Sequence, residues 1–215
     1  MKNLLYKEWK LAFHPTVALF WLLSAMVMIP AYPYPVIFFY TTLGLFFVCL
    51  TGRENNDLPY TLMLPVQKRD VVRARIAFAV QAEVIQLLCV LPFLFLRRAV
   101  GVGANPVGMD ANLAFLAEGL GVYGLYNLLF FPSYFAAPYQ VGKVFATRSI
   151  LLFVLIGLLE ALDHVLPFMR DCLDTPDPMY LPQKAIALVI GLAAFAGLSW
   201  LGCHLSIRHF EKLDV

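Results

Sequence analysis

The sequence predicts an all-α, polytopic membrane protein with six transmembrane helices. Of its 215 residues, 61% are hydrophobic and only 14% are charged, whereas a soluble domain is about 45–50% apolar and about 25% charged. The mean hydropathy is +0.75. A soluble domain of this length leaves roughly a third of its surface exposed, so it could not hide this much apolar surface from water. The surplus must face lipid, and a single transmembrane domain over residues 1–215 is the simplest interpretation.

Six apolar runs are long enough to cross the hydrocarbon core, which takes roughly 20 residues as a helix. They cover residues 15–31, 34–51, 76–96, 112–139, 149–166 and 184–207. The turn between the first two runs contains Pro30, Pro33 and Pro35. Because proline removes a donor and restricts the residue before it, this turn is predicted to be a tight hairpin. Pro132 and Pro138 predict a kink or break in the fourth run.

Residues 1–14 are expected to form a helix that lies in the headgroup region of the membrane. Leu4, Leu5, Trp9 and Ala12 fall near one face, and the lysines lie elsewhere, which is typical of an amphipathic interfacial helix. The segment does not resemble a secretory signal, because its charges are mixed and it shows no small-residue cleavage site. The alternative is a plain cytoplasmic extension of the first span.

The distribution of basic residues predicts the orientation. With an even number of spans both termini lie on one side, and twelve of the 16 lysines and arginines fall on that side. The other four are Arg97, Arg98, Arg170 and Lys184. The positive-inside rule therefore predicts a plasma-membrane protein whose N- and C-termini are cytoplasmic. The net charge of +2 and the lack of a basic stripe argue against nucleic acid as a partner.

The segment from Gly52 to Arg75 is the longest polar stretch between two apolar runs. A short helix starting near Asp57 is predicted within it, since Pro59 suits a first helical turn. Such a helix would show apolar side chains between charged flanks, so either the membrane surface or a cytoplasmic partner would have to cover it. An interfacial connector without a partner is the alternative.

Polar side chains within the apolar runs are costly to place in lipid. Glu83 and Gln86 lie at helical spacing in the third run, and Glu160 lies in the fifth. Such residues normally face a bundle interior or a water-filled path, so these three are candidates to line a translocation path. The alternative is a hydrogen-bonded packing contact. Three other ionisable groups are expected near a membrane boundary: Glu118, Asp163 and His164.

No sequence motif for catalysis, nucleotide binding or metal binding is present. The chain lacks the glycine-rich motifs of nucleotide-binding proteins, the His-Glu motif of zinc proteases and the serine motif of hydrolases. Its 4 cysteines lie far apart without a CxxC pair, which is typical of structural thiols. We therefore expect no catalytic residue, no metal site and no cofactor in this chain.

One stretch of the polar segment carries a recognisable pattern. Leu64 to Arg69 reads LPVQKR and Val71 to Arg75 reads VVRAR, which is similar to LPV-x-[KR]-x-x-[IV]-V-x-[AG]-[KR] after the second span of small ABC-2 permeases. With its six spans and its N-terminal helix, the chain resembles the permease subunit of an ABC transporter of the ABC-2 type. It most resembles small Gram-positive permeases that include exporters of phenol-soluble modulins, which are amphipathic cytolytic peptides.

This resemblance implies a mechanism and partners. Two permease chains, identical or different, would form the transmembrane unit, and a separate cytoplasmic ABC ATPase would bind ATP and Mg²⁺. Residues 54–66 would be a coupling helix seated in a groove of the ATPase, with apolar anchors and a charged rim. The partner-binding residues would be Arg53, Glu54, Asp57, Leu58, Tyr60, Leu62 and Met63.

Two other functions remain open from the sequence. The first is a membrane-embedded enzyme that acts on lipid or peptide through Glu83, Glu160 or His164. The second is a membrane immunity or assembly protein that transports nothing.

Overall fold

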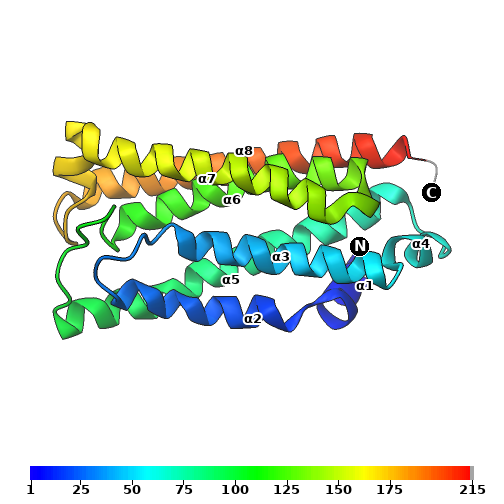
Figure 1. The fold of residues 1–215 in the computed structure, drawn as a ribbon, viewed down its shortest axis with the longest axis horizontal. Coiled ribbons are helices and arrows are strands. Elements are labelled where there is room, and N and C mark those ends of the chain that lie inside the picture. Colours follow the sequence, from blue (N-terminus) through cyan, green and yellow to red (C-terminus); the bar gives the residue numbers. More distant parts are fainter. Residues whose placement is uncertain (214–215) are drawn as a thin grey trace.

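The computed structural model describes residues 1–213, and within them all regular structure is helical. The all-α prediction is confirmed. The long helices run side by side along one axis (Figure 1). The N-terminal helix, α4 and the end of α8 lie at the same end of the bundle, which we call the terminal end. The opposite end, where α5 leads into α6 and α7 leads into α8, is called the far end.

The helical elements follow one another along the chain with short connections. They are α1 (Lys2–Lys7), the π-helical turn η1 (Glu8–Ala12), α2 (Pro15–Leu22), the 3-10 helix η2 (Leu23–Met28), α3 (Val36–Glu54), α4 (Asp57–Leu62), α5 (Lys68–Val100), α6 (Leu113–Ala136), η3 (Pro138–Gln140), α7 (Val141–Val165), η4 (Met169–Leu173) and α8 (Leu181–Glu211).

Five of the described helices are long and apolar enough to cross a membrane, namely α3, α5, α6, α7 with η3, and α8. A sixth crossing exists if the bent pair Lys2–Ala12 and Pro15–Met28 counts as one span, with a bend of 80° between its parts. The structure thus agrees with a polytopic membrane protein. Its first crossing helix ends at Met28, before the predicted end at residue 31.

Two helices begin well before their apolar runs. α5 begins at Lys68 rather than at residue 76, and α7 begins at Val141 rather than at residue 149. The added residues include several lysines and arginines, which are good helix formers. Hydropathy locates the part of a helix that lies in lipid, and a helix can continue past the membrane boundary.

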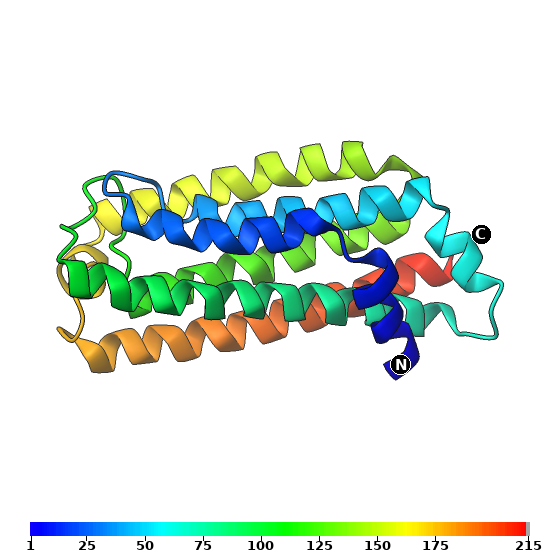
Figure 2. The same ribbon diagram turned by 90° about the horizontal axis from the view of Figure 1, so that it is seen from below.

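The N-terminal helix runs across the bundle at the terminal end, as Figure 2 shows. Trp9 donates a hydrogen bond from its indole nitrogen to Gln81 of α5 (2.7 Å). Its ring also packs edge-on against Phe78 of α5, with 4.9 Å between ring centroids. The Trp9 face of this helix is therefore fixed against α5, and Lys2 and Lys10 remain exposed.

Small residues bring α6 and α8 into close contact. A Cβ atom on Gly202 of α8 would lie 2.6 Å from the backbone oxygen of Asn127 in α6. A Cβ on Gly124 of α6 would lie 3.1 Å from the Cα of Phe195 in α8. Glycine permits this approach because it has no side chain to separate the two backbones. The result is a tightly packed α6–α8 pair.

One buried polar contact joins this pair to α5. The Asn127 amide of α6 donates hydrogen bonds to Glu83 of α5 (2.8 Å) and to Ser199 of α8 (2.9 Å). Buried polar groups cost free energy unless they are bonded. This contact therefore fixes the relative positions of three helices in the interior of the bundle.

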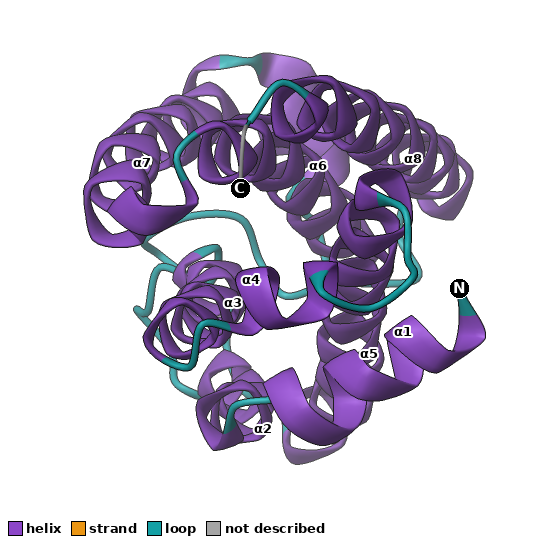
Figure 3. Cartoon of the chain, turned by 90° about the vertical axis from the view of Figure 1, so that its right-hand side faces the viewer, coloured by secondary structure: helices purple, strands orange, loops and turns teal. Residues whose placement is uncertain are grey.

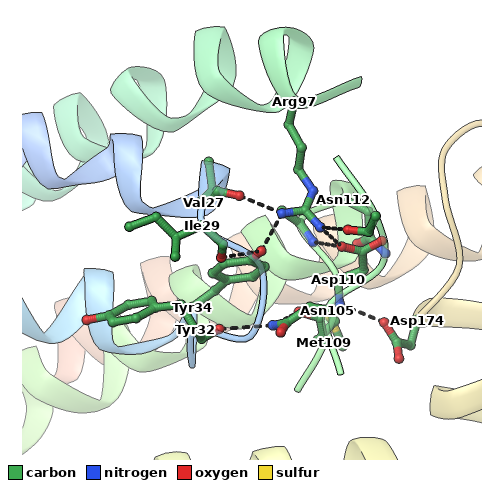
Figure 4. Close-up of polar contacts among 12 residues, drawn as sticks. Val27, Ile29, Tyr32, Tyr34, Arg97, Asn105, Met109, Asp110, Asn112 and Asp174 are labelled. Atoms are coloured by element: carbon green, nitrogen blue, oxygen red, sulfur yellow. Dashed lines mark hydrogen bonds and ion pairs between the residues drawn. The ribbon is translucent and has the colours of Figure 1, made fainter. Parts of the chain in front are cut away.

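Arg97 near the end of α5 holds the far-end loops together (Figure 4). Its guanidinium donates to the carbonyl of Val27 (2.6 Å) and to the hydroxyl of Tyr34, and it forms an ion pair with Asp110 (2.8 Å). The backbone nitrogen of Asp110 in turn donates to the carboxylate of Asp174 (2.6 Å). Three loops that are distant in sequence are thus linked through one arginine.

The α6–α8 contact predicts an asymmetric response to two alanine substitutions in α8. Gly202→Ala should lower the free energy of unfolding by about 1–3 kcal/mol, because the new methyl group overpacks the contact. Gly197→Ala is the control, since nothing lies within 4 Å of that Cβ position. It should leave stability unchanged or raise it by up to about 1 kcal/mol through helix propensity. Equal unfolding midpoints of the two variants in detergent would contradict the close approach.

Candidate functional site

The helix α4 lies across the terminal end of the bundle, as seen from that end in Figure 3. It is shorter than the expected range of 54–66 and starts after Asn56, which adopts a left-handed conformation (φ 51°). Asparagine tolerates this conformation better than most residues. Asp57 provides a negative charge in the first turn, where the helix dipole favours it. The chain leaves the helix at Met63, shortly before Pro65, which disfavours continuation.

Four charged side chains from three segments meet behind α4, and we call Lys7, Glu8, Asp57 and Arg75 the Arg75 cluster. Arg75 of α5 places Nε 2.5 Å from Glu8 Oε2 and Nη2 2.5 Å from Asp57 Oδ2. Lys7 Nζ lies 2.7 Å from Asp57 Oδ1 and 3.2 Å from Glu8 Oε1. The two positive and two negative charges balance. The cluster ties the N-terminal helix, α4 and α5 to one another.

The Arg75 cluster is largely removed from water. Arg75 and Glu8 are 2% and 1% exposed, and the backbone of Gly52 passes next to the guanidinium, leaving it room. A buried ion pair depends on both partners, because removing one leaves an uncompensated charge in a poorly solvated site. Each member therefore fixes the position of the others.

The positive charges next to Asp57 lower its pKa by more than burial raises it. Partial burial acts to raise the pKa of the Asp57 carboxyl, but the charge of Arg75 and the charge and hydrogen bond of Lys7 hold that pKa below its ordinary value. The carboxylate is thus negative at neutral pH. The Asp57 carboxylate also lies beside Thr61, whose hydroxyl donates a hydrogen bond to the Asp57 carbonyl one turn earlier in α4 (2.7 Å).

The residues of α4 divide into a buried face and an exposed face. Leu58 is only 7% exposed and packs in the core, so the expectation that it anchors a partner is corrected. Leu62 is partly buried. Tyr60 and Met63 are 68% and 82% exposed, and Leu64 extends the same apolar surface. We call Tyr60, Met63 and Leu64 the α4 outer face.

The charged residues before α4 lie at the rim of this site. Arg53 and Glu54 are exposed and lie 3.7 Å apart, at the long end of ion-pair distances. A hollow of about 160 Å³ lies between the end of α3, α4 and η1, lined in part by Leu11 and Tyr60. The terminal end therefore presents apolar side chains next to charged ones.

Comparison with protein families decides the broader assignment. A family model described as ABC-2 family transporter protein matches residues 3–211. The chain belongs to the ABC-2 transporter family. This confirms the resemblance at the level of the family and supports a multi-pass membrane protein that acts as a transporter component. Neither the curated proteins nor the solved structures provide a match.

The candidate path residues of this ABC-2 protein lie in two different places. Glu83 and Gln86 are fully buried; Glu83 accepts from Asn127, and Gln86 donates to Ser24 of η2 (2.9 Å). In this conformation they join helices to one another. Glu160 lies near the far end, where its side chain covers the backbone of Gly108, so the three residues do not form one site.

Sequence reasoning missed three of the four cluster residues in this ABC-2 protein. Lys7 was placed on the polar side of the N-terminal helix, and Glu8 and Arg75 were not singled out. A signal did exist, since Glu8 lies four residues from both Leu4 and Ala12 and so falls on the face expected to be apolar. A carboxylate on such a face needs a buried cation, and Arg75 is that cation.

The Arg75 cluster predicts that replacing Arg75 destabilises the protein much more than replacing the nearby Arg73. Arg75→Met should lower the free energy of unfolding by about 3–5 kcal/mol, because the buried Glu8 carboxylate loses its partner. Arg73→Met is the matched control, since Arg73 is exposed and its pair with Asp70 is 3.7 Å long. It should cost at most about 1 kcal/mol.

Denaturant unfolding in detergent, followed by circular dichroism, measures both values. Adding Glu8→Gln to Arg75→Met should restore part of the lost stability, because the uncompensated charge is removed. Equal losses for the two single arginine variants would show that the buried pair does not hold the terminal end together.

The lowered pKa of Asp57 predicts how its contribution varies with pH. The Asp57 carboxylate stabilises the folded state fully above its unfolded pKa of about 3.9, and this contribution is lost as the pH falls through the lower folded-state value. The stability difference between wild type and Asp57→Asn should thus be constant from about pH 5 to 8 and shrink below about pH 4. A difference that grows on acidification would contradict this assignment.

Proposed function

We propose that this chain is the permease subunit of an ATP-driven exporter, and that a separate ABC ATPase docks on the α4 outer face. The observation that carries the proposal is the way α4 is held. Its inner face is fixed by the Arg75 cluster, whereas Tyr60 and Met63 are 68% and 82% exposed. Exposed aromatic residues and methionine are enriched at protein interfaces.

The attachment of α4 makes it suited to transmit a displacement. It follows α3 after a two-residue connection and precedes α5 by a short segment, and Asp57 joins it to α5 and to the N-terminal helix. A partner that pushes on the α4 outer face therefore moves these segments together. ATP binding and Mg²⁺ binding belong to the ATPase in this proposal, and the permease supplies no cofactor site.

The orientation of the chain in the membrane is proposed from the distribution of its charged residues. The terminal end contains most of the lysines and arginines, so we place both termini and α4 in the cytoplasm and the protein in the plasma membrane. A second permease chain, identical or different, completes the transmembrane unit. The exposed apolar side chains of α7, such as Ile150, Val154 and Leu158, face lipid or that second chain.

The proposed cargo is an amphipathic or hydrophobic peptide, or a similar amphiphile, moved out of the cytoplasm or the membrane. Its support is the resemblance to permeases that export cytolytic peptides. A path past Glu83 and Gln86 would require α5 to separate from α6, because Glu83 is bonded to Asn127 in the present conformation. Alternating access would then consist of breaking and remaking this contact.

The enzyme alternative draws on residues in two places, because Glu83 lies in the interior whereas Glu160 and His164 lie one helical turn apart on α7 near the far end. Glu83 is bonded to Asn127, whereas a ring nitrogen of His164 lies 3.2 Å from the carbonyl of Val107 at the far end. These two groups have different partners and do not form a catalytic pair. Turnover of a lipid or peptide by the purified chain alone would nevertheless favour an enzyme over a permease.

If the ATPase docks on the α4 outer face, a charge at Met63 should weaken its binding. Met63→Glu should reduce co-purification of the ABC ATPase by about tenfold or more, since a charge in an apolar contact costs about 1–3 kcal/mol. Met179→Glu is the matched control, because Met179 is also exposed but lies in the connection between η4 and α8 at the far end. It should leave co-purification unchanged.

Both variants should unfold at the wild-type temperature, because neither side chain is buried. If Met63→Glu retains the ATPase as well as the control does, α4 is not the docking helix. If the chain co-purifies with no ATPase at all and cells lacking it export normally, the immunity or assembly function replaces the transporter.

A further inference from the structure

A cavity at the far end is not used by the proposed ATPase contact. Its volume is about 310 Å³, within the range of about 300–1,000 Å³ typical of small-molecule sites. The last turns of α5, the loop that follows it, the first turn of α6 and residues 176–177 enclose it. It thus lies where α5 and α6 diverge toward one side of the membrane.

The walls of the cavity form an apolar stripe that ends in a cation. Leu91, Leu94, Phe95 and Arg98 all line it and fall at positions i, i+3, i+4 and i+7 of α5. This spacing places them on one face of the helix. Leu113 and Leu116 of α6 extend the apolar wall. An elongated apolar group fits along the stripe, with a polar group at Arg98.

Most charges around the cavity are already neutralised. Arg97 is paired with Asp110 (2.8 Å), and Asp177 is paired with Lys184 (2.9 Å). Arg98 is exposed and makes no hydrogen bond or ion pair with another side chain of residues 1–213. The cavity therefore has one uncommitted positive charge at its rim, and its electrostatic complement is an anion.

We propose that this pocket binds one anionic phospholipid of the adjoining leaflet, with its headgroup at Arg98 and an acyl chain along the α5 stripe. Arginine suits this role because its planar guanidinium matches phosphate oxygens. Phe95 is 73% exposed, so the pocket opens sideways toward the bilayer, where phospholipid is abundant. The inference does not rest on the transport function, because binding needs neither the ATPase nor a cargo.

Native mass spectrometry of the delipidated full chain tests the proposal. The probes are phosphatidylglycerol, which is anionic, and phosphatidylcholine, whose headgroup also carries a cation that Arg98 disfavours. The wild type should prefer phosphatidylglycerol, and Arg98→Gln should weaken its binding about tenfold, as loss of a charged hydrogen bond implies. Arg170→Gln, at an exposed arginine outside the pocket, should retain the preference.

A second variant tests the contribution of the cavity to lipid binding separately from that of the Arg98 charge. Leu94→Trp should fill the cavity and weaken binding of both lipids while leaving the unfolding midpoint within a few degrees of wild type. The proposal is overturned if Arg98→Gln binds phosphatidylglycerol as wild type does. It is also overturned if glycerol phosphate, which has no acyl chain, competes as well as the lipid does. A change in the monomer–dimer ratio of Leu94→Trp without loss of lipid would show that a second copy covers the pocket instead.

Discussion

The buried guanidinium of Arg75 is the contact on which the terminal end depends. It forms ion pairs with Glu8 of the N-terminal helix and with Asp57 of α4, two residues that are far apart in sequence. An arginine cannot lose its proton at physiological pH, so its burial requires both carboxylates to be present and correctly placed. The position of α4 relative to the membrane helices is therefore determined by charge compensation as well as by apolar packing.

The same helix carries a second anchoring arginine. Arg97 lies about six turns after Arg75, which is about 33 Å along a helix axis and close to the thickness of about 30 Å of a hydrocarbon core. Arg75 gathers the segments at the terminal end, and Arg97 gathers the loops at the far end. Their separation thus matches the distance between the two boundaries of a hydrocarbon core, and α5 is the element that connects the two ends.

The sequence predicted what depends on local pattern and missed what depends on tertiary pairing. Apolar runs located the membrane-crossing parts of α3, α5, α6 and α8, because lipid imposes a length and a composition on each one. The apolar runs do not give the starts of α5 and α7, since charged helix formers continue both helices past the apolar segment. Asp57 was recognised as the start of a short helix, yet its bond to Arg75 could not be read from either residue alone. The burial of Leu58 was missed for the same reason, because the helical pattern does not say which face meets the bundle.

Different kinds of contact hold two groups of helices in the bundle. The N-terminal helix and α4 are bound to α5 through ion pairs, whereas α6 and α8 are joined by close backbone packing at glycines. Backbone packing of this kind resists sliding, and an ion pair among buried charges resists separation. Between them, Asn127 bonds to Glu83 in the interior, and the far-end cavity opens where α5 and α6 diverge. Moving α5 away from α6 would therefore break the bond between Glu83 and Asn127, and a molecule held in the far-end cavity would contact both of these helices.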